Sequence, residues 1–420
     1  MERRITVGLP VCGEVDVTRI LPLMNHPRFQ ALGRRNQLGA IQLVFPNAHH
    51  TRLEHSLGVF ELTRRRMDRW IRSGFVSEEA AWDACLYGLL HDIGHGPYSH
   101  VVEALCEHGH KAQGLRILEE LTDGIVACGS TVAALQCYFT GENPLYTAVG
   151  HHPLGTDKLD YLERDSLHTL ARVGIPAQRV IAWTDWRANR LVVHGEIVYE
   201  VLQLQVAYFD MFLRVYRRRA SLIIDRFFQK MIAQVMEQPE TGEPLTESEL
   251  WRMTDPELDA RLLQQVPAMY QRVLTRQLPR TVLTLRPTGM EYLERGVEFT
   301  PKVLGVSELL LAQFDRFYCP RACQTLERAL AGSLGVDERS VLVLPVVLAS
   351  RFTPKEIWVD YGAGSLRRVR DTWPHHFASL AERARSYLAV RVCVHEEIWQ
   401  RVRDQARELF ELLCAMAVER

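Results

Sequence analysis

A histidine and an aspartate, His91 and Asp92, directly follow two leucines at the end of an apolar helical pattern. A carboxylate buried among such side chains is costly unless it is paired or bound to a metal. Neighbouring residues of a helix point about 100° apart, so this pair can hold one ion from two sides. Any fold of this chain must therefore bring further polar partners to this point.

The segment TDKLDYLERD has a helical phase of its own. Asp157, Tyr161 and Asp165 follow one another at four-residue spacing and share one helix face. Asp160 and Arg164 share another face, where we expect an ion pair. A stripe of two carboxylates and a phenol is unusual for a helix flanked by apolar residues unless it lines a site.

Three separated segments, at 49–59, 89–100 and 156–165, carry histidines or aspartates in a helical context. Any one of these residues alone is more simply explained as a surface or core residue. His95 lies one turn after His91, so we expect it to face the same pocket. Taken together, the three segments predict a metal site.

Most of residues 50–236 has the pattern of helices. We expect one helix to begin at Ser77, where a hydroxyl and two following acids favour a helix start, and to end near Gly94. Pro97 suits the first turn of the next helix. The further predicted helices lie at 97–109, 157–171 and 201–236.

The C-terminal part differs in character. A polar connection at 237–246 precedes two helix starts, at the capping box of Thr246 and at Asp255-Pro256. Three stretches have strand composition, and a helix closes the chain. The sequence therefore predicts a mainly α fold, with a helical catalytic domain over 1–236 and a helical and α+β region over 237–420. The predicted strands lie at 281–287, 340–350 and 355–362.

Composition excludes few classes of function. The 50 basic and 51 acidic residues balance, so global charge indicates neither nucleic acid nor an anionic membrane as a partner. The nine cysteines do not form a disulfide pattern, and we read Cys319 and Cys323 as reduced thiols. With no apolar signal-peptide core and no stretch of about 18 apolar residues, we expect a cytoplasmic protein.

The segments FPNAHHTRLEHSLGV, HDIGHGPYSH and TDKLDYLERD resemble the HD-domain deoxynucleoside triphosphate triphosphohydrolases, which include bacterial enzymes and the human SAM-and-HD-domain protein. The resemblance covers about residues 15–235 and implies a helical HD-domain core. It also implies four metal ligands, His55, His91, Asp92 and Asp157. Such a set suits Mn, Mg, Fe, Ni, Co or Zn, and the sequence does not choose among them.

The same resemblance implies a substrate site. Gln37 and Leu38 match residues that contact the sugar, and Arg52 matches an arginine that contacts phosphates. A planar guanidinium group suits phosphate oxygens. Lys158 matches a phosphate-binding lysine, and the resemblance also implies sugar-binding roles for Tyr161 and Asp165. The remaining candidate phosphate contacts lie in the basic run Tyr216-Arg217-Arg218-Arg219, within which we assign Tyr216, Arg218 and Arg219.

Three histidines match family residues beside the α-phosphate. We rank His100 first as phosphate contact or general acid, with His95 and His110 close behind. The family often has His-Glu where this chain has His110-Lys111. A carboxylate that would orient this histidine is therefore expected to be missing.

Three functions remain open at this point. The first is hydrolysis of deoxynucleoside triphosphates to deoxynucleoside and triphosphate, and the second is an HD phosphohydrolase acting on nucleoside monophosphates or another phosphoester. The third is a nucleotide- or nucleic-acid-binding protein with a residual HD site. We expect a deoxynucleotide substrate, no membrane partner and, by resemblance, a homo-oligomer. Nothing in the sequence supports a nucleic acid partner.

Overall fold

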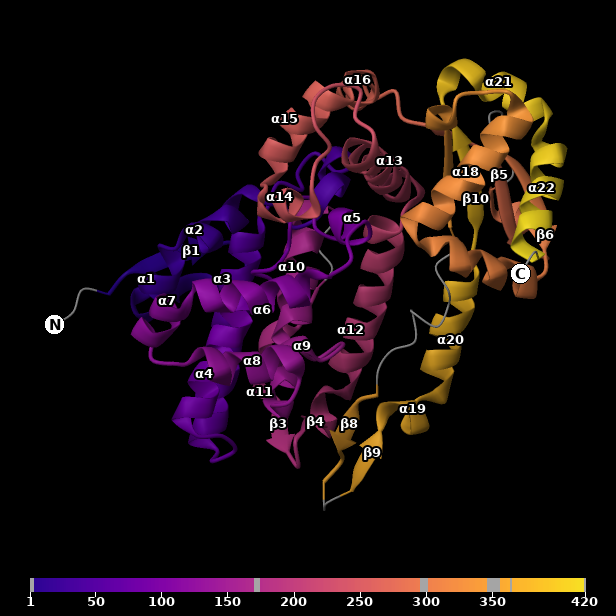
Figure 1. The fold of residues 1–420 in the computed structure, drawn as a ribbon. Coiled ribbons are helices and arrows are strands. Elements are labelled where there is room, and N and C mark those ends of the chain that lie inside the picture. Colours follow the sequence, from indigo (N-terminus) through magenta and orange to yellow (C-terminus); the bar gives the residue numbers. More distant parts are fainter. Residues whose placement is uncertain (1–3, 170–173, 295–300, 346–355, 363–364, 419–420) are drawn as a thin grey trace.

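The computed structural model describes residues 4–169, 174–294, 301–345, 356–362 and 365–418. Helices make up most of it, and the strands lie mainly towards the C-terminus (Figure 1). The predicted mainly α fold, with an α+β C-terminal part, is confirmed. None of the helices in the described ranges is long and apolar enough to cross a membrane.

Three helices carry the segments singled out in the sequence. α3 (Arg52–Arg72) begins at a capping box in which Thr51 and Glu54 satisfy each other's backbone amides. α4 (Glu78–Leu90) begins at Ser77 as predicted, with the Ser77 hydroxyl accepting a bond from Ala80. α3 packs along both α4 and α10 (Thr156–Thr169), so the three segments meet on one side of α3. The predicted end of α10, beyond 169, lies outside the described residues.

The helix predicted over 97–109 is wrong, because only α5 (His100–Glu103) forms there, ahead of α6 (His110–Glu120). Tyr98 and Ser99 have positive φ angles of 51° and 53°, which a continuous helix does not allow. A buried carboxylate, Asp255, accepts a 2.8 Å hydrogen bond from the backbone N–H of Tyr98. Tertiary contacts thus hold a backbone that local sequence preference opposes.

The single long helix predicted over 201–236 is also wrong. The chain forms α12 (Val198–Met211), a π-helical segment (Phe212–Tyr216) and then α13 (Arg219–Glu237). The break falls at Arg217 and Arg218, in the middle of the basic run. α13 packs on α5 and on the turn at 39–43, so it covers one side of the site described below.

The C-terminal part contains a sheet in the order β6-β5-β10-β7. Its strands are β5 (Arg280–Pro287), β6 (Lys302–Val306), β7 (Val341–Leu344) and β10 (Val390–Val394). The prediction of strands at 281–287 and at the start of 340–350 is confirmed, and 346–350 lies outside the described residues. The helices beside this sheet include α18 (Pro320–Leu334), α21 (Glu396–Asp404) and the predicted closing helix α22 (Ala406–Val418).

A second sheet joins the two halves of the chain, in the order β3-β4-β8-β9. The hairpin of β3 (Thr184–Arg187) and β4 (Arg190–His194) was not predicted. β8 (Trp358–Asp360) runs parallel to β4, with β9 (Leu366–Arg368) beside it (Figure 1). Strand pairing therefore crosses the boundary predicted at 236/237, and the division into two domains stays a prediction.

A buried ion-pair network fixes α13 to the C-terminal sheet. Glu327 of α18 accepts 3.0 Å bonds from Arg226 and Lys230 of α13 and a 2.9 Å bond from the backbone of Val343 in β7. All three charged side chains are buried. A buried charge is stable only when it is paired in this way, so the network specifies where α13 sits.

Candidate metal centre and adjoining pocket

The four predicted metal ligands lie together. His55 comes from α3, His91 and Asp92 follow α4, and Asp157 lies in the first turn of α10. Nε2 of His55 is 3.7 Å from Asp92 and 3.4 Å from Asp157. Nε2 of His91 is 3.4 Å from Asp92 and 3.7 Å from Asp157. The structure thus brings two imidazoles and two carboxylates from three segments to one point.

The side chains present fit a divalent metal. Nε2 of His55 and Nε2 of His91 are buried and have no hydrogen-bond partner among the described residues. Nδ1 of His55 donates to Asp160 over 2.8 Å, and Nδ1 of His91 donates to the carbonyl of Gly88 over 2.9 Å. Both rings therefore direct Nε2 at the two carboxylates, as in histidine metal sites.

The two carboxylates are held ionised. Burial raises the pKa of Asp92, but His91 and Arg52 outweigh it and hold this pKa well below its usual range. Burial likewise raises the pKa of Asp157, and Lys158 with the neighbouring histidines outweighs it in the same direction. Two negative charges thus remain beside the two imidazoles, which is a set that attracts a divalent cation.

A second layer of residues fixes the orientation of His55. Asp160, fully buried, also accepts bonds of 2.9 Å and 2.7 Å from the fully buried guanidinium group of Arg164, which confirms the predicted ion pair. Gly58 allows this approach, because a Cβ there would lie 2.0 Å from the Asp160 carboxylate. His55, the predicted ligand on α3, is therefore oriented by the buried ion pair of Asp160 and Arg164 on α10.

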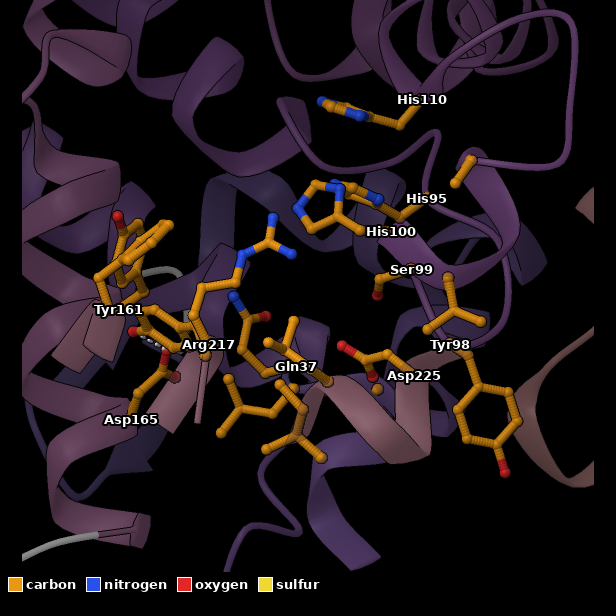
Figure 2. A pocket seen from close by; sticks show the side chains of 18 of the residues that line it. Gln37, His95, Tyr98, Ser99, His100, His110, Tyr161, Asp165, Arg217 and Asp225 are labelled. Atoms are coloured by element: carbon orange, nitrogen blue, oxygen red, sulfur yellow. Dashed lines mark hydrogen bonds between the residues drawn. The ribbon is translucent and has the colours of Figure 1, made fainter. Parts of the chain in front are cut away.

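A cavity of about 490 Å³ opens beside these ligands (Figure 2). Asp92 and Asp157 form part of its wall, so the metal centre borders the cavity. Every residue predicted to bind substrate lines it except Arg218 and Arg219. The predicted residues in the wall are Gln37, Leu38, Arg52, Lys158, Tyr161, Asp165 and Tyr216.

Two cations stand beside the metal ligands. Arg52 is ion-paired with Asp92 and donates a 2.7 Å bond to the hydroxyl of Ser99. Nζ of Lys158 lies 4.0 Å from Asp157 and 4.5 Å above the ring of Tyr161. Both positive groups therefore border the ligand cluster on the cavity side, where a phosphate group would meet them.

The buried carboxylate of Asp165 already has two partners. His50 donates to it over 2.7 Å, and the hydroxyl of Tyr216 donates over 2.6 Å. A carboxylate can accept further bonds, so the predicted contact with a sugar hydroxyl remains open. The role of His50 as a partner of Asp165 was not predicted.

Three histidines border the cavity on another side. His95 is buried and stacks on His110 with the ring centroids 4.0 Å apart, whereas the side chain of His100 is 76% exposed. The four groups of His95, His100, His110 and Glu103 are close enough to hold an ion. The stacked rings are only 14° from parallel, however, so their in-plane lone pairs do not converge.

The expectation that His110 lacks an orienting carboxylate is wrong. Glu103 accepts a 2.9 Å bond from Nδ1 of His110 and a 2.8 Å bond from Nδ1 of His100. Burial opposes ionisation of Glu103, but its bonds to the two histidines outweigh burial and hold its pKa well below the usual range. The three-residue spacing of His100 and Glu103 in a helical stretch was the available signal.

Replacing Glu103 with glutamine is expected to lower kcat by about 10- to 100-fold, because two imidazoles lose a charged acceptor and their fixed tautomer. The measurement is the initial rate of phosphoester hydrolysis at saturating substrate. Exposed Glu107 in the following loop provides the control, and Glu107→Gln should retain the rate of the parent chain. Equal rates for the two variants would contradict a role for Glu103 in holding these rings.

Only part of the basic run lies at the cavity. Arg218 and Arg219 are exposed and do not line the cavity, whereas Arg217 does. The reason is the break after the π-helical segment, which no sequence pattern predicted. Asp225 of α13 also lines the cavity, and burial raises its pKa to about 7 against the opposing effect of Arg217.

Comparison with known proteins bears on this arrangement. A family model described as "HD domain" matches residues 52–173, which include the four clustered ligands. The chain thus contains an HD domain. HD domains bind divalent metals, and they are phosphohydrolase domains, in keeping with the donor set found here.

The relatives agree with the predicted resemblance. Uncharacterized protein YwfO of Bacillus subtilis is 27% identical over 227 residues, covering 50% of this chain and 52% of that protein. The deoxynucleoside triphosphate triphosphohydrolase SAMHD1 homolog of Dictyostelium discoideum is 24% identical over 273 residues, with coverages of 57% and 53%. The chain thus spans about half the length of these curated relatives.

Two solved structures share the fold of the HD domain and its C-terminal part. A phosphohydrolase from Bacteroides thetaiotaomicron has a TM-score of 0.71 at 20% identity, over 94% of this chain and all of that one. A hypothetical protein from Aquifex aeolicus has a TM-score of 0.72 at 22% identity, over 96% of this chain and all of that one. At sequence identities this low, the similarity shows a shared fold and nothing further.

Proposed function

We propose that this chain hydrolyses deoxynucleoside triphosphates to deoxynucleoside and inorganic triphosphate. The observation that carries the proposal is the HD ligand cluster opening onto one cavity that also holds Arg52, Lys158 and Tyr161. A metal donor set, two cations and an aromatic face suit a phosphorylated sugar. The names of the SAMHD1 relatives give the same reaction for those proteins.

The substrate would lie between two sets of side chains. Gln37, Tyr161 and Asp165 would bind the deoxyribose, since an amide, an aromatic face and a carboxylate offer both apolar contact and hydrogen bonds to a 3′-hydroxyl. The buried side-chain oxygen of Gln37 has no partner within the described ranges, so it is free to accept such a bond. Arg52 and Lys158 would face the phosphates.

The reaction exchanges one bond at the α-phosphorus. A water oxygen bonds to the phosphorus and releases one proton to solvent, the bond to the 5′-oxygen breaks, and this oxygen takes up a proton from a general acid as the deoxynucleoside leaves. His55, His91, Asp92 and Asp157 would hold a divalent metal, which would supply Lewis-acid stabilisation of the phosphate charge.

Side chains of the protein would offset the negative charge of the phosphates and would supply the proton. Arg52 and Lys158 would offset negative charge on the phosphate oxygens as the water oxygen bonds to the α-phosphorus. His100, with Nδ1 fixed by Glu103, would present its other nitrogen as the proton donor to the 5′-oxygen. The stacked pair of His95 and His110 would border the same phosphate.

Product analysis tests the proposal. The full chain is incubated with each of the four dNTPs, the NTPs and the dNMPs, in turn with manganese, magnesium, cobalt and nickel, and the products are separated by anion-exchange chromatography. We expect equimolar deoxynucleoside and inorganic triphosphate from the dNTPs. Orthophosphate released from dNMPs would favour the monophosphate phosphohydrolase instead. Metal binding without turnover, together with salt-sensitive binding of single strands, would favour the binding protein.

A further inference from the structure

The break between α12 and α13 gives Arg217 a direction different from its neighbours. The backbone N–H of Arg217 bonds to the carbonyl of Phe212 over 2.7 Å, which closes a π-helical turn instead of an α-helical one. Such turns are rare and frequently occur at functional sites, because one extra residue in the turn reorients the side chains that follow. Arg217 is the residue at which this turn ends.

The side chain of Arg217 reaches into the cavity. Figure 2 shows its guanidinium group extending across the cavity towards the side of His95 and His100. Arg214, Arg218 and Arg219 are exposed and do not line the cavity. Of these four arginines, which lie within six residues of one another, Arg217 is the one whose side chain lines the cavity.

Most donors of Arg217 remain available for a ligand. The other cavity arginines are committed, since Arg52 is ion-paired with Asp92 and Arg226 with Glu327. Within the described ranges no carboxylate lies at ion-pair distance from Arg217. One N–H of the guanidinium group bonds to the hydroxyl of Tyr318 over 2.6 Å, and a guanidinium group has five such donors.

Tyr318 comes from the C-terminal part of the chain. It ends the 3₁₀ segment Phe314–Tyr318, immediately before α18, and it also lines the cavity. α18 carries Glu327, whose bonds to Arg226 and Lys230 fix it to α13. The partner of Arg217 is therefore held on a rigid element that is tied to the helix following Arg217.

We propose that Arg217 binds the terminal phosphates of the substrate and that Tyr318 is the positioning residue that holds its guanidinium group; this inference rests on the proposed function. Arg52 and Lys158 adjoin the metal ligands and so suit the α-phosphate end of the chain of phosphates. Arg217 enters from a different wall of the same cavity and adds the positive charge that a longer polyphosphate needs.

Binding of inorganic triphosphate tests the proposal without turnover. Isothermal titration calorimetry on the full chain, loaded with manganese, is expected to show a Kd about 10- to 100-fold higher for Arg217→Ala, the loss typical of charge-assisted hydrogen bonds. Arg217→Lys should have a Kd between those of the parent chain and Arg217→Ala. Arg214→Ala removes an equal charge from the exposed face of the same turn and should bind like the parent chain.

The role of Tyr318 has its own readout. Tyr318→Phe should raise KM for dNTPs about 3- to 10-fold with kcat unchanged, and it should add nothing when combined with Arg217→Ala. Arg217→Ala should also reduce the preference for dNTP over dNDP. An unchanged triphosphate Kd in Arg217→Ala, or a loss seen in Arg218→Ala instead, would overturn the inference. A chain that binds triphosphate through Arg217 but releases none from dNTPs would overturn the proposed function alone.

Discussion

Replacing Asp92 with alanine is expected to lower the rate of hydrolysis by roughly 1,000-fold or more. Asp92 lies within 3.7 Å of the free Nε2 atoms of His55 and His91 and forms an ion pair with Arg52. Its loss removes a ligand and leaves a buried arginine without its partner. Several kcal/mol of charge stabilisation depend on the bound metal, and each factor of ten corresponds to about 1.4 kcal/mol.

Two measurements check this result. Metal content after dialysis, determined by plasma mass spectrometry, should fall together with the rate of triphosphate release. Asp123→Ala, on the exposed side of α7 (Thr122–Ala127), removes an acid of equal size and should leave both unchanged. A variant of Asp92 that retains both metal and activity would refute the ligand assignment.

Replacing Asp160 with alanine is expected to cost about 3–5 kcal/mol in the free energy of unfolding, because it leaves the fully buried Arg164 unpaired. It should also weaken metal binding about 10- to 100-fold, since Nδ1 of His55 loses its acceptor. Urea denaturation measures the first effect and metal titration the second.

A paired variant separates these two effects. Asp160→Ala combined with Arg164→Met removes both charges, so much of the stability should return. Metal affinity should stay low, because His55 still has no acceptor on Nδ1. Recovery of both quantities in the double variant would show that Asp160 acts on the metal centre only through folding.

The sequence predicted the parts of the site that follow from helical spacing. Asp157, Asp160 and Arg164 lie on one predicted helix, and their two faces could be assigned without tertiary information. His91 and Asp92 stand out because a carboxylate after an apolar helix needs a partner. We inferred from the family resemblance that His55 joins these residues, because helical spacing alone does not specify which helices pack together.

The errors come from bonds at sequence separations that α-helical spacing does not predict. Asp255 bonds to the backbone of Tyr98 from 157 residues away and replaces a predicted helix with a tight turn. The π-helical turn before Arg217 breaks a pattern whose apolar periodicity is continuous, so it could not be read from periodicity. Glu103 reaches His110 across seven residues because the intervening chain turns back. Each case is a contact between residues that local preference does not relate.

The parallel pairing of β8 with β4 has a consequence for the architecture as a whole. Ile357 and Val359 are part of the same apolar core as the helices of the HD domain. Deleting all residues after 236 would remove the strand that pairs with Val192 and Val193 of β4. The backbone N–H and C=O groups on that edge of β4 would be left unpaired, and such an edge promotes aggregation. The two predicted regions are thus joined by strand pairing and by a shared apolar core, through a segment that returns from the C-terminal third of the chain.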